Sequence, residues 1–212
     1  CVAHAADDYP AKPIRMLTSA VGSGSDVVGR FIADYLGQRL GQRGYIDNRG
    51  ILAPELAAHA APDGYTIVLY STPLWVQPFL RDNTPWDPQR DFVPITLAVD
   101  TPNVLVVHPS VPVRSVRELI ALARAKPGQL NYGTGSSGSS SHLAAELFDA
   151  MANVRITRVP YKGVGPATMA LLAGEINLVF ATGTTVSPHI KSGRLRALAV
   201  SSIKPSALFP GM

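Results

Sequence analysis

The chain has 212 residues, of which 46% are hydrophobic and only 16% are charged, and its formal net charge is +4. This composition is typical of a globular protein with one large domain or two small ones, and it excludes a disordered chain. The charge is mild and aromatic residues make up only 7%, scattered along the chain, which argues against nucleic-acid binding. The single cysteine, Cys1, cannot form a disulfide framework or a cysteine-based zinc site within one chain. No apolar run approaches the roughly 18 residues of a membrane span.

The first residues resemble the end of a signal peptide. Ala3-His4-Ala5 has the A-x-A form of a signal-peptidase site. Residues 1–8 are therefore expected to be a signal remnant, or equally an alanine-rich tail. Cys1 as a lipid anchor is a further alternative, which the sequence does not support.

The first half of the chain alternates strand and helix patterns. A strand is predicted over residues 13–18, a small-residue loop over 19–25, and then a helix for which Asp26 is the expected cap. The apolar face of this helix repeats close to every 3.6 residues, at Val27, Val28, Phe31, Ile32, Tyr35, Leu36 and Leu40. Further elements are predicted as strands over 44–48 and 65–70 and a short helix over 54–61. This alternation predicts a parallel α/β sheet, in which ligands bind beyond the carboxyl ends of the strands.

Residues 78–103 contain five prolines, which break any long element, and are interpreted as a connection between domains. The strand–helix alternation then resumes. Strands are predicted over 104–107, 129–132, 156–159, 176–180 and 195–200, with helices over 116–125, 143–151, 166–173 and 186–191.

The loop over residues 131–142 carries three glycines and five serines between a strand and a helix. Glycine lets the backbone turn and lets a ligand approach closely, and serine caps helices. The first turn of the helix would then point free N–H groups and a partial positive charge into the loop. Such a loop is typical of a site for an anion, such as a carboxylate or a phosphate.

Two other interpretations of this loop stay open. Gly133, Gly135 and Gly138 match the G-x-G-x-x-G pattern of dinucleotide sites, but that pattern also needs an acidic residue about 20 residues on. The residues that follow the next predicted strand, 160–162, include none. The loop could also be a polar connection that binds nothing.

Ten short runs, individually weak, occur together in order: 9–15 (YPAKPIR), 26–30 (DVVGR), 47–49 (DNR), 62–66 (PDGYT), 103–107 (NVLVV), 130–133 (LNYG), 139–144 (SSSHLA), 159–163 (VPYKG), 188–191 (PHIK) and 195–200 (LRALAV). Jointly they resemble the Bug family, the extracytoplasmic solute receptors of tripartite tricarboxylate transporters. The resemblance covers nearly the whole chain.

The resemblance implies a periplasmic binding protein of type II, with two α/β lobes joined by a hinge. Lobe 1 would span residues 9–101 and lobe 2 residues 102–196, with 197–212 as a hinge strand that returns to lobe 1. The implied function is capture of a small carboxylated metabolite, a di- or tricarboxylate or an acidic amino acid, without catalysis. The implied partners are membrane permease subunits of the transporter, the implied location is the periplasm, and no cofactor or metal is expected.

In the family, backbone amides, hydroxyls and water from loops of both lobes hold the ligand carboxylates. Carried over to this chain, the ligand-binding residues are Ala20, Val21, Gly22, Ser23, Gly24, Ser25, Asp26, Ser71, Thr72, Thr134, Gly135, Ser136, Ser139, Ser140, Tyr161, Lys162, Gly163, Ala181 and Thr182.

The chain departs from the family in four places. Residues 19–24 replace a loop near Pro-Phe-x-Pro-Gly-Gly, and residues 50–54 replace a longer glycine-rich loop. Ala181 stands where the family often has Asp. Family members continue well past Met212, so the chain resembles a C-terminally truncated member whose first lobe is incomplete and would expose core surface.

Two alternatives to solute capture remain on the sequence alone. An α/β enzyme could use the same Gly/Ser loops, with His142 as the only base within reach, although no G-x-S-x-G elbow is present. A receptor-derived protein could have lost solute binding. Lys162 could pair with a carboxylate or lie in solvent, Asp26 is expected to cap its helix rather than bind, and Trp75 and Trp86 are expected to be packing residues. The histidine spacing does not favour a metal site.

Overall fold

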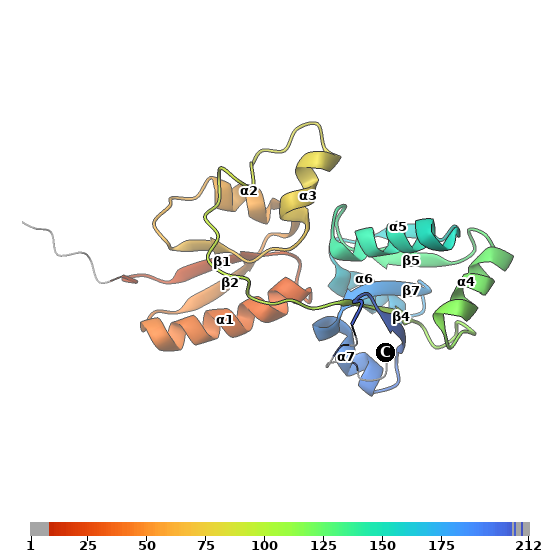
Figure 1. The fold of residues 1–212 in the computed structure, drawn as a ribbon. Coiled ribbons are helices and arrows are strands. Elements are labelled where there is room, and N and C mark those ends of the chain that lie inside the picture. Colours follow the sequence, from red (N-terminus) through yellow and green to blue (C-terminus); the bar gives the residue numbers. More distant parts are fainter. Residues whose placement is uncertain (1–8, 205, 207–208, 210–212) are drawn as a thin grey trace, which may run out of the picture.

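In a computed structural model, the chain forms two α/β lobes that lie side by side (Figure 1). The structure describes residues 9–204, 206 and 209. The predicted fold class is confirmed, with a parallel sheet in the first lobe and a mixed sheet in the second.

The first lobe has a three-stranded parallel sheet in the order β2-β1-β3. Its strands are β1 (Ile14–Thr18), β2 (Gly44–Asn48) and β3 (Thr66–Val68). Helix α1 (Gly24–Leu40) covers one face, and the 3₁₀ turn η1 (Gly50–Leu52), α2 (Ala53–Ala58) and α3 (Pro73–Leu80) lie on the other side (Figure 1).

The second lobe has a five-stranded sheet in the order β6-β5-β7-β4-β8. In chain order its elements are β4 (Asn103–Val107), α4 (Val116–Ala125), β5 (Asn131–Thr134), α5 (Ser140–Ala152), β6 (Thr157–Pro160), α6 (Val164–Leu172), β7 (Leu178–Thr182), α7 (Gly183–Lys191) and β8 (Arg196–Val200). Strand β5 is parallel to β6 and β7, whereas β4 is antiparallel to β7 and β8.

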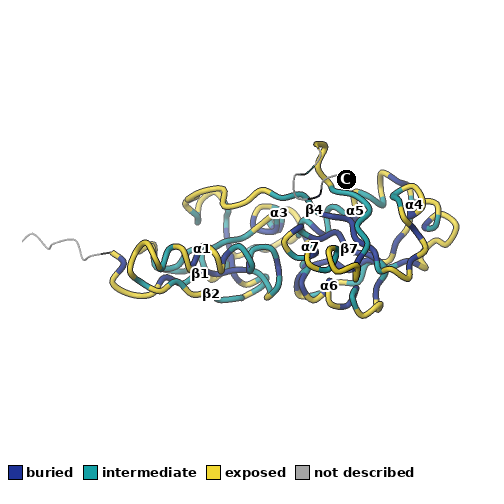
Figure 2. The backbone as a smooth tube through the Cα atoms, turned by 90° about the horizontal axis from the view of Figure 1, so that it is seen from below, coloured by how far each residue is buried: buried dark blue, intermediate teal, exposed yellow. Residues whose placement is uncertain are grey.

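The core of the second lobe lies on both faces of this sheet, as the buried segments around β4 and β7 show (Figure 2). Leu105 and Val107 of β4 pack with α4 and α5, and Val104 and Val106 pack on the opposite face with α6 and α7. All four are at most 2% exposed. A strand covered on both faces needs a continuous apolar run, which is the pattern that β4 has.

Helix α3 lies partly inside residues 78–103, which are predicted to form a connection between domains. Pro78 lies within this helix, where it removes the N–H that would bond the carbonyl of Leu74. The indole Nε1–H of Trp86 donates to that carbonyl instead, at 3.2 Å. The buried Trp86 therefore stabilises a helix that the proline count had argued against, whereas Trp75 is 52% exposed.

The predicted apolar face of α1 is not the face that packs on the sheet. Asp26, Gly29 and Ala33 are the buried residues of α1, whereas Phe31 is 73% exposed and Tyr35 56% exposed. The connection over residues 92–100 also exposes alternate apolar side chains, with Val93, Ile95 and Leu97 at least 78% exposed. It crosses the first lobe in extended form before it enters β4 (Figure 1).

Of the segment 197–212, which is predicted to return to the first lobe, residues 197–200 belong to the second sheet, and the return of the other residues stays a prediction. Residues Arg196–Val200 form β8, which pairs with β4 at the edge of the second sheet. Residues 205, 207, 208 and 210–212 lie outside the described part, as do residues 1–8 with the predicted signal remnant. Among the described helices, none is long and apolar enough to cross a membrane.

Candidate functional site

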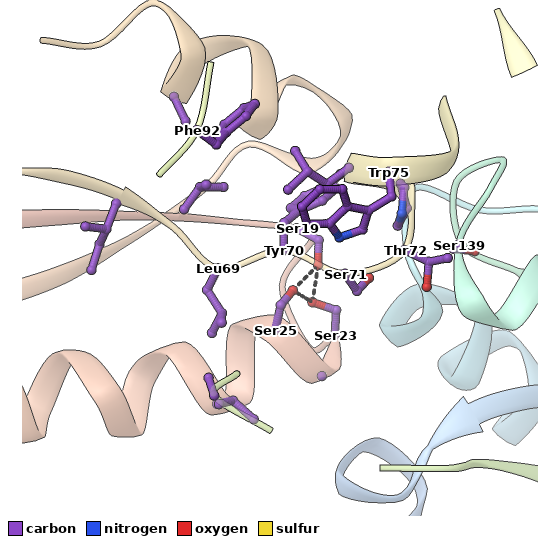
Figure 3. Close-up of a pocket in the computed structure, with 18 of the residues that line it drawn as sticks. Ser19, Ser23, Ser25, Leu69, Tyr70, Ser71, Thr72, Trp75, Phe92 and Ser139 are labelled. Atoms are coloured by element: carbon purple, nitrogen blue, oxygen red, sulfur yellow. Dashed lines mark hydrogen bonds between the residues drawn. The ribbon is translucent and has the colours of Figure 1, made fainter. Parts of the chain in front are cut away.

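A cavity of about 1140 Å³ lies between the lobes and extends along β3 beneath the connection over residues 92–100. Its polar part is lined by the loops that follow β1, β3, β5, β6 and β7. Figure 3 shows Ser23 and Ser25 after β1, Ser71 after β3, and Ser139 after β5. Within the described residues, no group of three or more His, Cys, Asp or Glu side chains could hold a metal ion.

Five helices begin at this cavity. The lining includes the first residues of α1 and α3 from the first lobe and of α5, α6 and α7 from the second. First-turn amides have no acceptor within their own helix, and each helix start carries about half a positive charge. Helix α3 differs, because Pro73 has no N–H and the amides of Leu74 and Trp75 donate to the carbonyls of Ser71 and Thr72. Each of these helices has at least eight residues. The part of the wall at these helix starts is therefore electropositive. Among the described residues, the charged side chains in the lining are Lys162, Asp91 and Asp100, and the two carboxylates lie on the connection rather than at the helix starts.

The loop that starts α1 is held by a network of its own polar groups. Ser23 is the N-cap, because its hydroxyl accepts the Asp26 amide at 3.3 Å, so the prediction that Asp26 caps the helix is wrong. The hydroxyls of Ser19, Ser23 and Ser25 bond one another, with 2.6 Å between Ser19 and Ser23 (Figure 3). These hydroxyls line the cavity and can each turn a proton toward a bound oxygen.

Asp26 lies beneath this loop rather than in the cavity. Asp26 is 2% exposed, and its carboxylate accepts hydrogen bonds from the Gly22 amide and from Asn48 Nδ2, both at 2.9 Å. Arg30 lies 2.9 Å from the same carboxylate. Burial on its own raises the pKa of Asp26, but the bonds from Asn48, Gly22 and Arg30 outweigh it and leave the pKa below 3.8.

The Gly/Ser loop of the second lobe is tied in the same way. Ser139 caps α5 by accepting the His142 amide at 3.3 Å, and Ser141 Oγ accepts the Gly135 amide at 3.1 Å. The Gly138 amide donates to His142 Nδ1 at 3.1 Å. Side chains at the start of α5 thus fix the position of the loop.

The predicted ligand-binding residues divide into two groups. Those that line the cavity are Ser23, Gly24, Ser25, Ser71, Thr72, Gly135, Ser136, Ser139, Ser140, Lys162, Gly163 and Thr182. Those outside the lining are Ala20, Val21, Gly22, Asp26, Thr134, Tyr161 and Ala181. Of these, Thr134 and Ala181 are fully buried in strand ends, which leaves them no surface to offer a ligand.

Several lining residues were not predicted from the sequence: Ser19, directly after β1, and Ser141, Val164 and Thr184 in the first turns of α5, α6 and α7. Ser19 and Ser141 belong to the serine-rich loops and could have been included on composition. Val164 lines the cavity because it is the first residue of α6. Its side chain is apolar, so composition alone does not indicate a binding residue there.

His142 links the Gly/Ser loop to the body of the second lobe, and it gives the loop a dependence on pH. Nδ1 accepts the Gly138 amide only while it is unprotonated, and Nε2 lies 3.5 Å from Glu146. Burial, followed by the nearby charge of Arg158, lowers the pKa of His142 below 6.5, against the opposing effect of Glu146.

The pKa of His142 is lower in the folded chain than in the unfolded chain, so the folded chain is disfavoured once the imidazole is protonated. Its stabilisation is complete above the unfolded-state pKa and is lost as the pH falls below that value. We therefore expect the free energy of unfolding to fall between about pH 7 and about pH 5, and to fall less in His142→Gln. Denaturant unfolding of both chains at the two pH values measures the difference. An equal loss in both would contradict this role for His142.

Comparison with known proteins places the chain among solute receptors. The sequence model described as "Tripartite tricarboxylate transporter family receptor" matches residues 28–212. The chain is 38% identical to Protein BugT of Bordetella pertussis over 98% of its own length, and it spans 66% of BugT, less than two thirds.

Two solved structures share its fold over more than nine tenths of the chain. One is R. palustris Rpa4515 with adipate, with 35% sequence identity and a TM-score of 0.88, where the match covers 92% of this chain and 68% of that chain. The other is the periplasmic binding protein BugD, with 29% sequence identity and a TM-score of 0.89, where the match covers 93% of this chain and 68% of that chain. The family resemblance of the sequence is therefore confirmed: the chain belongs to the tripartite tricarboxylate transporter receptor family, which includes the Bug proteins.

Proposed function

We propose that this protein captures a small carboxylated solute between its two lobes, a di- or tricarboxylate or an acidic amino acid. The observation that carries the proposal is the convergence of the N-termini of α1, α5, α6 and α7 on one interlobe cavity. The start of α3 adds its partial positive charge, but its first amides are already bonded. Helix starts bind carboxylates through free amides and a partial positive charge, without a metal or cofactor.

The two lobes supply complementary parts of the site. The α1 and α3 starts lie on the first lobe, and the α5, α6 and α7 starts on the second. A solute with a carboxylate at each end could therefore be held by both lobes at once, which favours the closed arrangement. The adipate in Rpa4515 is a solute of this kind.

The remaining parts of the proposal rest on the family. Receptors of tripartite tricarboxylate transporters serve a membrane transporter, so we infer delivery of the solute to permease subunits from the periplasm. The inferred role involves no catalysis. In line with this, His142, the one candidate base, uses Nδ1 to hold Gly138 and directs Nε2 toward Glu146, and it is not among the residues that line the cavity.

Lys162 is the only basic side chain among the described residues that line the cavity. It is exposed, so its attraction for a carboxylate is screened by water and salt. We expect Lys162→Gln to weaken solute binding by about threefold to tenfold, and the difference from wild type to shrink at high salt. Titration at two salt concentrations measures it. A complete loss of binding would contradict a site built mainly from backbone amides.

Isothermal titration calorimetry tests the proposed function directly. The panel is malate, succinate, glutarate, adipate, citrate, aspartate and glutamate, added to the 212-residue chain. Micromolar or tighter binding of at least one, about −8 kcal/mol, is expected. Binding of none would favour a receptor-derived protein that no longer takes solute.

A further inference from the structure

The two lobes touch directly on one side of the cavity, through residues that have no side chain. Gly22, in the loop before α1, lies against Gly165, in the first turn of α6. A β-carbon on Gly165 would lie 2.7 Å from the carbonyl oxygen of Val21 and 2.9 Å from the carbonyl carbon of Gly22. The Thr185 hydroxyl of α7 also donates to the Gly22 carbonyl, at 3.4 Å. We refer to Val21, Gly22 and Gly165 as the seam.

Two more glycines lie close to residues of the opposite lobe. A β-carbon on Gly163 would lie 2.6 Å from Cβ of Ala20, and one on Gly24 would lie 2.9 Å from the Thr182 hydroxyl. At Gly163 and Gly24 the obstructing atoms belong to side chains, one of which can rotate. At Gly165 they are backbone atoms of the opposite lobe, so a methyl group there can be accommodated only by moving the lobes apart.

We propose that the seam acts as a stop that sets how closely the lobes approach, and that it thereby selects the length of the solute. This inference rests on the proposed capture of a carboxylate by both lobes. With backbone against backbone, the helix starts of the two lobes come as near to each other as the chain allows. Short dicarboxylates, whose two charges are close together, gain most from such an approach.

Gly165→Ala is the decisive substitution. Gly165 does not have a positive φ, unlike Gly22 with φ +76°, so alanine fits its helical backbone and helix α6 is expected to be slightly more stable. The lobes, however, must separate until the 2.7 Å contact reaches the ordinary range of 3.4 Å or more. The matched control is Gly37→Ala, the same change inside α1, where a β-carbon meets its nearest neighbour at 3.4 Å.

Two measurements test the inference. Spin labels at Gln38 and Lys191, in a Cys1→Ser background, report the distance between lobes by double electron–electron resonance. Calorimetry reports the affinity for malate and for adipate. In Gly165→Ala we expect a longer label distance, at least a tenfold loss for malate and a smaller loss for adipate, whereas Gly37→Ala matches wild type.

An unchanged label distance in Gly165→Ala would overturn the seam as a stop. Equal losses of affinity for malate and adipate would overturn its role in selecting length. A wild-type chain that binds no member of the carboxylate panel would instead contradict the proposed function, and the label distances would still decide whether the seam limits closure.

Discussion

Replacing Gly135 with leucine is expected to abolish solute binding. Gly135 lies between the starts of α5 and α6, and a β-carbon there would sit 3.4 Å from both Ser139 Oγ and the Val164 amide nitrogen. A leucine side chain built from this point fills the space in which an anion would meet both helix starts. Loss of two hydrogen bonds to a charged group, each contributing about 1.5–3 kcal/mol, corresponds to at least a hundredfold weaker binding.

The control for Gly135→Leu is Ser137→Leu, which places the same side chain in the same loop at an exposed position outside the cavity lining. Calorimetry with the tightest solute of wild type compares the three chains, and thermal unfolding confirms that each is folded. Gly135→Ala is expected to weaken binding less than Gly135→Leu, because a methyl group fits with its nearest neighbours at 3.4 Å. A folded Gly135→Leu chain with wild-type affinity would show that the solute lies elsewhere.

Replacing Asp26 with alanine is expected to lower the free energy of unfolding by about 3 kcal/mol, because it leaves buried donors without an acceptor. The donors are the Gly22 amide and Asn48 Nδ2, which the carboxylate now accepts at 2.9 Å. The exposed Asp34 of the same helix provides the control, and Asp34→Ala is expected to change stability by less than about 0.5 kcal/mol.

The same substitution has a predictable dependence on pH. Since the folded-state pKa of Asp26 is lowered from 3.8, its stabilisation is complete above the unfolded pKa and is lost as the pH falls below it. The difference between wild type and Asp26→Ala should therefore be largest near neutral pH and shrink toward about pH 3. Denaturant unfolding at both pH values measures this. A difference that is independent of pH would contradict an ionised Asp26 in the folded chain.

The sequence alone was sufficient for the features that depend on local patterns. The alternation of strands and helices, the glycine- and serine-rich loops at the ends of β1 and β5, and the family resemblance all follow from residues close together in the chain. Loops at the carboxyl ends of parallel strands meet at one edge of a sheet. This is why most predicted loop residues line the same cavity, while their role in binding stays a prediction.

Features set by distant partners could not be predicted in this way. The periodicity of α1 predicts an apolar face but does not identify what covers it, and Phe31 and Tyr35 on that face are exposed. Helix α3 depends on Trp86, and the pairing of β8 with β4 joins residues nearly a hundred positions apart. The contact of Gly22 with Gly165 likewise exists only once both lobes are folded.

The most direct test of the central claim is to follow the backbone amides themselves. In ¹H–¹⁵N correlation spectra, titration with the tightest dicarboxylate of the panel should shift the first-turn amides of Gly24, Ser25, Ser140, Ser141 and Val164 with one common saturation curve. The amides of Gly41 and Gly193, at helix ends away from the cavity lining, should stay in place. Saturable binding that leaves the first-turn amides unmoved would contradict capture of the solute by helix N-termini.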